Sequence, residues 1–203
     1  LEFEKPIEQL DNKVHELKSL NDNAPSDNLL EEITQVEEQI NETYRKIYSS
    51  ISPWQRTLVA RHPQRPKTRE YIQNLIEDFF PLSGDRFFSE DKAILGGFGK
   101  FRGKTVLVLG HEKGHDTTSR IEHNFGMPRP EGYRKAQRLM KIAEDFDIPV
   151  ISFVDTPGAY PGVGAEQRGQ SEAIAKTTEC CLSLGVPIIA TIIAVSYTHL
   201  TLP

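Results

Sequence analysis

Two short stretches of this 203-residue chain carry residue types and spacings that could do chemistry. The first, His111-Glu112-Lys113-Gly114-His115, matches H-E-x-x-H, in which two imidazoles one helical turn apart bind zinc and the glutamate is the general base. The second, residues 155–166 (DTPGAYPGVGAE), is rich in glycine and proline and joins a predicted strand to a predicted helix. Its chemistry would come from main-chain amides rather than from side chains.

The H-E-x-x-H match does not predict a zinc site in this context. His111 follows directly on the apolar segment 106–109 and Gly110, so the pentapeptide leaves a strand instead of lying on a helix. Gly114 would interrupt the helix that the motif requires, and no motif for a third ligand follows. We therefore interpret the pentapeptide as a chance match and expect no metal site in this chain.

The glycine- and proline-rich segment leaves the carboxyl end of a predicted strand, where ligands bind in open parallel sheets. Its glycines permit a close approach of the backbone to a ligand, and its prolines restrict the chain. Such a turn can direct N–H groups at one point and stabilise a developing negative charge. The spacing fits neither a dinucleotide fingerprint, nor a P-loop, nor a nucleophile elbow. Spacing alone does not separate an oxyanion hole from a tight turn that only packs a helix on a strand.

Apolar patterning predicts the elements that would position this turn. A hairpin of strands, 93–101 and 104–109, is expected around an Arg102-Gly103 turn, and further strands at 150–155 and 186–193. Helices are expected at 67–80, 133–146 and 166–184. Alternation of strand and helix beyond the hairpin predicts parallel pairing with right-handed crossovers.

The N-terminal quarter has a different character. Residues 4–20 and 28–51 carry apolar side chains at helical spacing around the breaker cluster 21–27, which predicts an antiparallel helical hairpin. Residues 1–50 hold 12 acidic and 5 basic residues, so the chain's formal charge of −5 originates here. Without a basic stripe or an apolar run of ~20 residues, we expect no nucleic-acid partner and no membrane span. Adjacent Cys180 and Cys181 build no disulfide framework, which favours the cytoplasm.

Several polar residues beside these elements allow two interpretations each. Arg134, Arg138 and Lys141 share a predicted helical face and could meet a phosphate, but we favour a solvated face. The residues that open the last predicted helix could contact a partner or a ligand, but we favour capping of the helix and contact with solvent; they are Glu166, Arg168 and Gln170.

Four stretches taken together resemble a known family: VARHPQRPKTREYI, GDRFFSEDKAILGG, NFGMPRPEGYRKAQRLM and DTPGAYPGVGAEQRGQSEAIA. With them the chain resembles the alpha subunits of bacterial-type acetyl-coenzyme A carboxylase carboxyltransferase, from residue 1 to about Ile193. The resemblance implies an α/β, crotonase-like fold of ββα units wound into a superhelix, with the helical hairpin as an appendage. The expected domains are the hairpin at 1–51, a partial carboxyltransferase domain at 52–193, and a tail at 194–203 that departs from the family.

The resemblance also implies a function. Family members transfer a carboxyl group from carboxybiotin, held on a biotin carrier protein, to acetyl-CoA, and the malonyl-CoA formed enters fatty-acid synthesis. The implied partners are a carboxyltransferase beta subunit in an α2β2 assembly, with zinc on that subunit, and biotin carboxylase. In this chain the expected oxyanion donor is the N–H of Gly158 or Ala159. Tyr160, Gly162 and Gly164 are expected to shape the carboxybiotin site.

The end of the sequence leaves alternatives open. The family continues after Ile193 with a glycine-rich turn, whereas this chain reads AVSYTHLTLP, so we expect it to be inactive alone, with residues 187–193 as an exposed edge strand. One alternative is another acyl-CoA enzyme of the same fold, such as a biotin-dependent decarboxylase or a hydratase. The other is a non-catalytic module in which the helical hairpin binds a partner.

Overall fold

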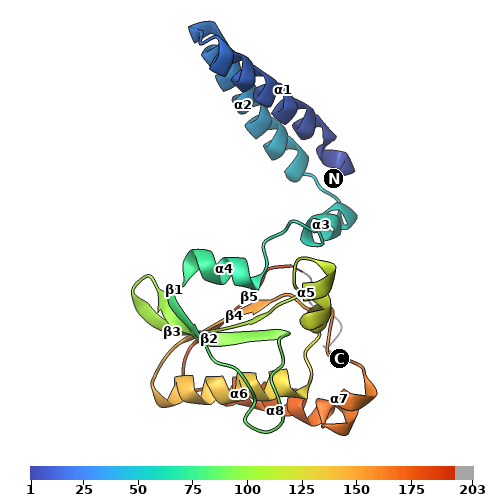
Figure 1. Ribbon diagram of the computed structural model, residues 1–203, viewed down its shortest axis with the longest axis vertical. Helices are drawn as coiled ribbons and strands as arrows, with labels where there is room; N and C mark the ends of the chain where they lie inside the picture. The colour runs from blue at the N-terminus through green and yellow to red at the C-terminus, as the bar shows by residue number, and fades with distance from the viewer. Residues whose placement is uncertain (195–203) are drawn as a thin grey trace. The chain divides into compact units, whose positions relative to one another are not determined.

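The computed structural model describes residues 1–194 of the chain, and it contains two compact units that divide between His62 and Pro63 (Figure 1). Almost all of the predicted tail, residues 195–203, lies outside the described residues. No helix in the described part of the chain is long and apolar enough to cross a membrane.

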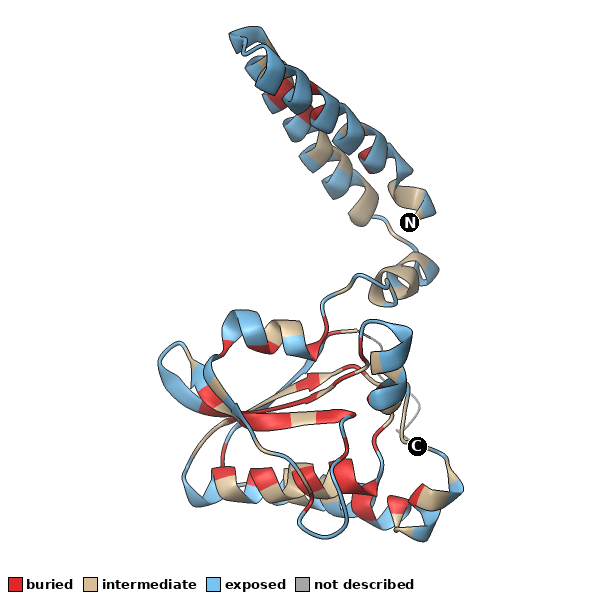
Figure 2. Cartoon of the chain, in the orientation of Figure 1, coloured by how far each residue is buried: buried red, intermediate tan, exposed pale blue. Residues whose placement is uncertain are grey.

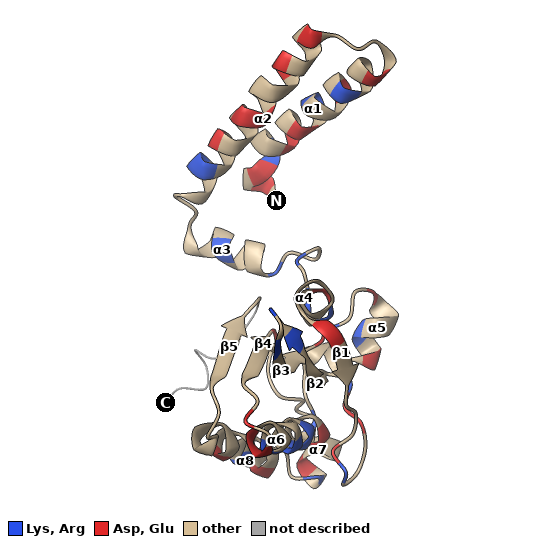
Figure 3. Cartoon of the chain, turned by 90° about the vertical axis from the view of Figure 1, so that its left-hand side faces the viewer, with Lys and Arg blue, Asp and Glu red and all other residues tan. Residues whose placement is uncertain are grey.

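The N-terminal unit is a helical hairpin followed by a short helix, and the predicted hairpin is confirmed. After a 3-10 turn at Glu2–Glu4, α1 spans Lys5–Asn23, α2 spans Asp27–Tyr48, and α3, which was not predicted, spans Pro53–Ala60. The apolar seam between α1 and α2 is formed by Val14, Leu17, Ile33 and Val36. Charged residues are spread along the outer surface of both helices (Figure 3), and cross-helix ion pairs join Lys13 to Glu32 and Lys18 to Glu37.

The second unit is built on a five-stranded sheet in the order β1-β2-β3-β4-β5. The strands are β1 (Glu77–Pro81), β2 (Ile94–Phe101), β3 (Lys104–His111), β4 (Val150–Val154) and β5 (Ile188–Ile192). The first three strands pair antiparallel, and β3, β4 and β5 pair parallel, as strand–helix alternation predicted. The β2–β3 turn is confirmed at Arg102-Gly103, where φ is 49° and 77°, values suited to a tight hairpin turn.

Helices cover both faces of this sheet (Figure 1). One face is covered by α6 (Pro130–Asp145) and α8 (Gln170–Ser183), and the other by α4 (Thr68–Leu75). Shorter elements complete the unit: α5 (Thr117–Glu122), a 3-10 turn at Asn124–Gly126, and α7 (Val163–Gln167).

The two faces of the sheet have separate cores because side chains alternate along a strand. Leu107 and Leu109 of β3 pack with the helix α6, whereas Val106 and Val108 pack with α4. Buried residues accordingly gather in the sheet and along α6 (Figure 2). Cys180 and Cys181 are partly buried against the α6 core, which confirms their interpretation as half-buried apolar residues.

Glycines in β2 allow both layers to approach the sheet closely. A Cβ at Gly96 would overlap the side chain of Leu139 on α6, and a Cβ at Gly99 would overlap that of Ile76, just beyond α4. Both helices therefore lie closer to β2 than a side chain there would permit.

Two predicted helices differ from the structure, and one predicted edge strand agrees with it. The helix expected over 67–80 ends at Leu75, and residues 77–81 form β1 instead, because pairing with β2 overrides the local helical spacing. The helix expected over 166–184 is divided, since Gly169 adopts φ +78° between α7 and α8. The exposed edge strand is confirmed: β5 ends the order of described strands and all five of its residues are exposed.

Candidate oxyanion turn at the end of β4

The glycine- and proline-rich turn lies where sequence predicted it, between the end of β4 at Val154 and the start of α7 at Val163. β4 is flanked by the parallel strands β3 and β5, so the turn leaves the carboxyl end of the parallel part of the sheet. This is the edge at which open α/β sheets bind ligands.

Hydrogen bonds inside the turn distinguish its two candidate donors. The N–H of Gly158 donates to the Thr156 hydroxyl oxygen at 3.0 Å, and that hydroxyl lies 2.7 Å from the carbonyl oxygen of Gly126. The N–H of Ala159, by contrast, has no hydrogen-bond partner among residues 1–194. Gly158 has a φ of +141°, a backbone conformation that is essentially restricted to glycine. Of the two amides, that of Ala159 is the one whose N–H no described residue uses.

The far side of the turn is held by Gln170. Its side chain is buried, and Nε2 lies 2.9 Å from the carbonyl oxygen of Pro128 and 3.1 Å from that of Tyr160. The Tyr160 N–H also donates to the Pro128 carbonyl at 3.0 Å, and the Arg129 guanidinium lies 4.9 Å from the Tyr160 ring centre. The expectation that Gln170 contacts solvent is therefore wrong, because its buried amide satisfies the carbonyl groups of two separate loops.

The two remaining candidate glycines, Gly162 and Gly164, differ in the space that a side chain would have. A Cβ at Gly162 would overlap the Tyr160 ring, so a side chain there would displace the ring. At Gly164 a Cβ would meet only the guanidinium of Arg168, at 3.2 Å, and that flexible group can move away. The structure thus brings Tyr160 and Gly162 together and leaves Gly164 on the first turn of α7.

The HEKGH pentapeptide forms the end of β3 and the following loop, not a helix, as its context predicted. Glu112 is fully buried and accepts hydrogen bonds from the backbone N–H groups of Arg69 and Gly114, at 3.1 and 2.9 Å. A carboxylate engaged in this way is a structural acceptor and not a general base poised on a metal-bound water. Within the described residues, no three His, Cys, Asp or Glu side chains are grouped closely enough to hold a metal ion.

The same pentapeptide contacts the turn through Lys113. The Lys113 ammonium forms an ion pair with Asp155, the buried residue with which the turn begins. His111 lies in the same region, and burial lowers the pKa of its imidazole to about 4, against smaller opposing contributions from the Phe153 backbone and the Asp155 carboxylate. At neutral pH His111 is therefore uncharged, and its Nδ1 has no partner in the described part of the chain.

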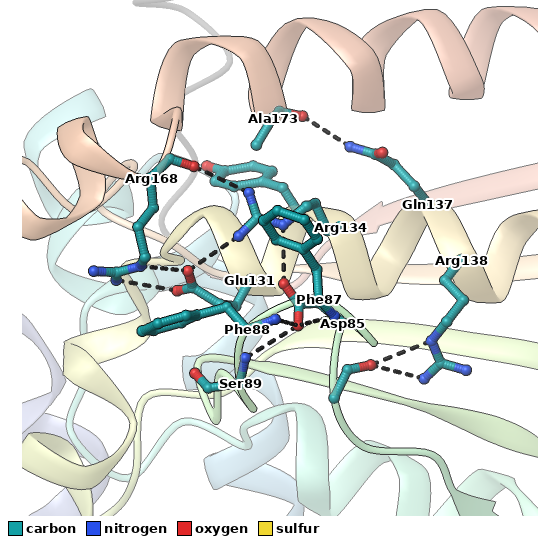
Figure 4. A network of polar contacts seen from close by, with 12 residues as sticks. Asp85, Phe87, Phe88, Ser89, Glu131, Arg134, Gln137, Arg138, Arg168 and Ala173 are labelled. Atoms are coloured by element: carbon teal, nitrogen blue, oxygen red, sulfur yellow. Dashed lines mark hydrogen bonds and ion pairs between the residues drawn. The ribbon is translucent and has the colours of Figure 1, made fainter.

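A second polar network ties the start of α6 to the end of α7 (Figure 4). The buried carboxylate of Glu131 accepts from Arg168 Nε at 2.6 Å and from Arg134 Nη2 at 3.1 Å. Arg134 Nη1 also donates to the Arg168 carbonyl at 3.0 Å. These bonds fix α7, and with it the end of the turn, against the first turn of α6.

The network continues into the loop before β2. Burial would raise the pKa of Asp85, but the backbone N–H groups of Phe88 and Phe87 and the Arg134 guanidinium outweigh it and lower that pKa. The Ser89 N–H also donates to this carboxylate, at 3.1 Å. Arg138 donates to the carbonyl oxygen of Gly84 at 2.9 Å. The predicted solvated face is thus wrong for Arg134 and Arg138, whose guanidinium groups bind this loop (Figure 4).

Comparison with solved structures identifies the fold. The transcarboxylase 12S structure with methylmalonyl-coenzyme A and methylmalonic acid bound matches with a TM-score of 0.51 and 20% identity, over 64% of this chain and 23% of that one. A single-chain, multi-domain long-chain acyl-CoA carboxylase matches with a TM-score of 0.53 and 22% identity, over 66% and 13%. The fold is crotonase-like, of the kind found in these carboxyltransferases, as the resemblance predicted.

Sequence comparison then gives the family. The family model described as acetyl co-enzyme A carboxylase carboxyltransferase-like matches residues 1–196, and the chain belongs to this family. Relatives from Paramagnetospirillum magneticum and Caulobacter vibrioides, both named acetyl-coenzyme A carboxylase carboxyl transferase subunit alpha, are 55% and 56% identical over 95% of this chain. The chain spans about three fifths of their length, 61% and 60% respectively.

Sequence reasoning missed Lys113, Glu131 and Gln170 as supports of the turn. Each of them has a partner 37 to 42 residues away in sequence, and no local spacing could reveal these contacts. The local signals were weak: Glu131 and Gln170 lie in stretches that carry the family resemblance, and Lys113 lies in the HEKGH pentapeptide.

Proposed function

We propose that this chain is the part of a carboxyltransferase alpha subunit that binds carboxybiotin and stabilises negative charge as the carboxyl group departs for acetyl-CoA. The observation that supports this most directly is the Ala159 N–H, which has no partner in the described residues although it lies in a turn fixed on both sides. A partly negative oxygen is the ligand that such a donor fits. The family and the fold agree with the proposal.

The residues present fit a planar, weakly charged group. Ala159 would donate to its oxygen, Gly162 leaves room beside the Tyr160 ring, and Gly158 provides a backbone conformation that other residues adopt only with strain. Bound carboxybiotin would supply the carboxyl group to be transferred. The chain's own contribution is to hold its donors in place before reaction, so that little reorganisation accompanies the appearance of charge.

The proposal also covers the partners of this chain and the product of the reaction. We expect a carboxyltransferase beta subunit in an α2β2 complex, a biotin carrier protein, biotin carboxylase and acetyl-CoA as partners, in the cytoplasm, with malonyl-CoA as product. The helical hairpin at 1–51 would be an appendage, and residues 52–193 would be part of the carboxyltransferase domain.

Replacing one amide by an ester tests the proposed donor. In the full-length chain assembled with its beta subunit, Ala159→lactic acid removes the N–H and keeps the side chain. We expect malonyl-CoA formation from carboxybiotin and acetyl-CoA to fall by about 100-fold or more. The matched control is Ala173→lactic acid, which removes an N–H that donates to the Gly169 carbonyl at the start of α8. Undiminished transfer with the ester at 159 would overturn the proposal, and decarboxylation without transfer would favour a decarboxylase.

A further inference from the structure

We infer that Lys113 is a positioning residue of the carboxyl-transfer site. Its ammonium neutralises the Asp155 carboxylate at the base of the turn, so that the N–H donors of the turn can stabilise an anion without an opposing negative charge. This inference rests on the proposed function. Lys113 is the third residue of the HEKGH pentapeptide, so the inference gives this pentapeptide a role that does not involve zinc.

The ion pair lies at the base of the turn. Asp155 directly follows β4, three residues before Gly158, and its side chain is 6% exposed. Lys113 Nζ contacts Asp155 Oδ1 and its side chain is 23% exposed, so the pair is shielded from water mainly on the carboxylate side. Charges interact more strongly where water is excluded. An unpaired Asp155 carboxylate would therefore oppose any negative charge at the neighbouring amides.

The other polar groups near Asp155 do not compensate the charge of its carboxylate. His111 is neutral at pH 7, because burial lowers its pKa to about 4, and so it provides no compensating charge. Thr156 and Gly158 direct their hydrogen bonds toward each other and toward Gly126. Among the described residues, Lys113 is the cation that forms an ion pair with Asp155.

The position of Lys113 is itself fixed by the loop that holds the turn. Gly126 has φ +74°, and a Cβ there would overlap Cγ of Lys113, so the lysine stem passes directly over this glycine. The carbonyl oxygen of the same glycine lies 2.7 Å from the Thr156 hydroxyl. One residue therefore supports both the cation and the turn, which places the ammonium reproducibly against Asp155.

A double-variant cycle tests the inference in the full-length chain assembled with its beta subunit. Lys113→Met leaves Asp155 uncompensated, and we expect kcat to fall by about 100-fold with KM changed less than about threefold. Adding Asp155→Asn removes the opposing charge as well, and kcat should return to within about tenfold of wild type. Lys113→Arg keeps the charge and should retain kcat within about tenfold.

The control is the exposed pair of Lys100 and Asp78, 2.8 Å apart on the β1–β2 edge, for which Lys100→Met should leave kcat unchanged. A double variant no more active than Lys113→Met would overturn the inference, as would a loss in Lys113→Arg equal to that in Lys113→Met. Unchanged kcat in Lys113→Met, with transfer abolished by the ester at Ala159, would refute the inference alone. Unchanged transfer in both would refute the proposed function.

Discussion

Gln170, the first residue of α8, donates from its side-chain amide to the carbonyl oxygen of Tyr160, 3.1 Å away and ten residues earlier in the chain. The same nitrogen lies 2.9 Å from the carbonyl of Pro128, just before α6. One buried side chain thus joins the turn to the two helices that cover one face of the sheet. The turn is held by its surroundings as well as by its own glycines and prolines.

Removing this amide should loosen the turn. We expect Gln170→Leu to leave the carbonyl groups of Pro128 and Tyr160 with fewer hydrogen bonds, to lower the free energy of unfolding by about 1–3 kcal/mol, and to reduce transfer at least tenfold. Denaturant unfolding and malonyl-CoA formation measure the two effects. Gln137→Leu is the matched control, because Gln137 donates to Ala173 and Thr177 between the same helices. If both variants lose transfer equally, the effect comes from helix packing and not from the turn.

The backbone at Gly158 should not accept a side chain without loss of function. With φ at +141°, Gly158→Val strains the turn, and we expect transfer to be abolished while thermal unfolding stays cooperative. Gly103→Val provides the comparison: it also replaces a glycine of positive φ, +77°, but in the β2–β3 turn, where a Cβ meets open space. Normal turnover in Gly158→Val would show that the turn is only structural.

The buried carboxylate of Glu131 should contribute more stability than exposed ion pairs do. Glu131→Gln leaves Arg134 and Arg168 without their shared partner, and since both are partly exposed we expect a loss of about 2 kcal/mol in the free energy of unfolding. Glu172→Gln breaks the exposed pair with Lys176 and should leave the free energy of unfolding almost unchanged. Urea unfolding midpoints separate the two, and equal midpoints would contradict a structural role for the network.

Buried His111 should make stability depend on pH. Burial lowers the imidazole pKa to about 4, from an ordinary value near 6.5, so below pH 6.5 the unfolded chain gains a proton that the folded chain does not. Above pH 6.5 this difference in protonation does not affect the free energy of unfolding. As the pH falls from 6.5 to 4, it lowers the free energy of unfolding by as much as about 3 kcal/mol. His111→Gln should show a shallower decline over this range. Parallel wild-type and variant curves would contradict the assignment.

Features with local causes could be predicted from sequence. The Arg102-Gly103 hairpin follows from turn chemistry, and the parallel strands follow from the alternation of strand and helix. The position of the turn at 155–162 follows from the glycines and prolines directly after an apolar run. In each case the residues that decide the structure are neighbours in the chain.

Features decided by distant partners could not be predicted in this way. Residues 77–81 continue a helical apolar spacing, and only the presence of β2 makes them a strand. The sequence around Arg134 suggests a surface residue, yet its guanidinium donates to the carboxylate of Asp85, 49 positions earlier. Likewise, the choice between the Gly158 and Ala159 amides required the position of the Thr156 hydroxyl.

The glycines of β2 have a practical consequence for anyone who wishes to stabilise this protein. Exchanging glycine for alanine often raises stability by restricting the unfolded chain. At Gly96 that strategy would press against Leu139 and push α6 outward, and the first turn of α6 carries Glu131. Engineering for thermal robustness should therefore leave β2 untouched and begin on the solvent-facing surface of the helical hairpin.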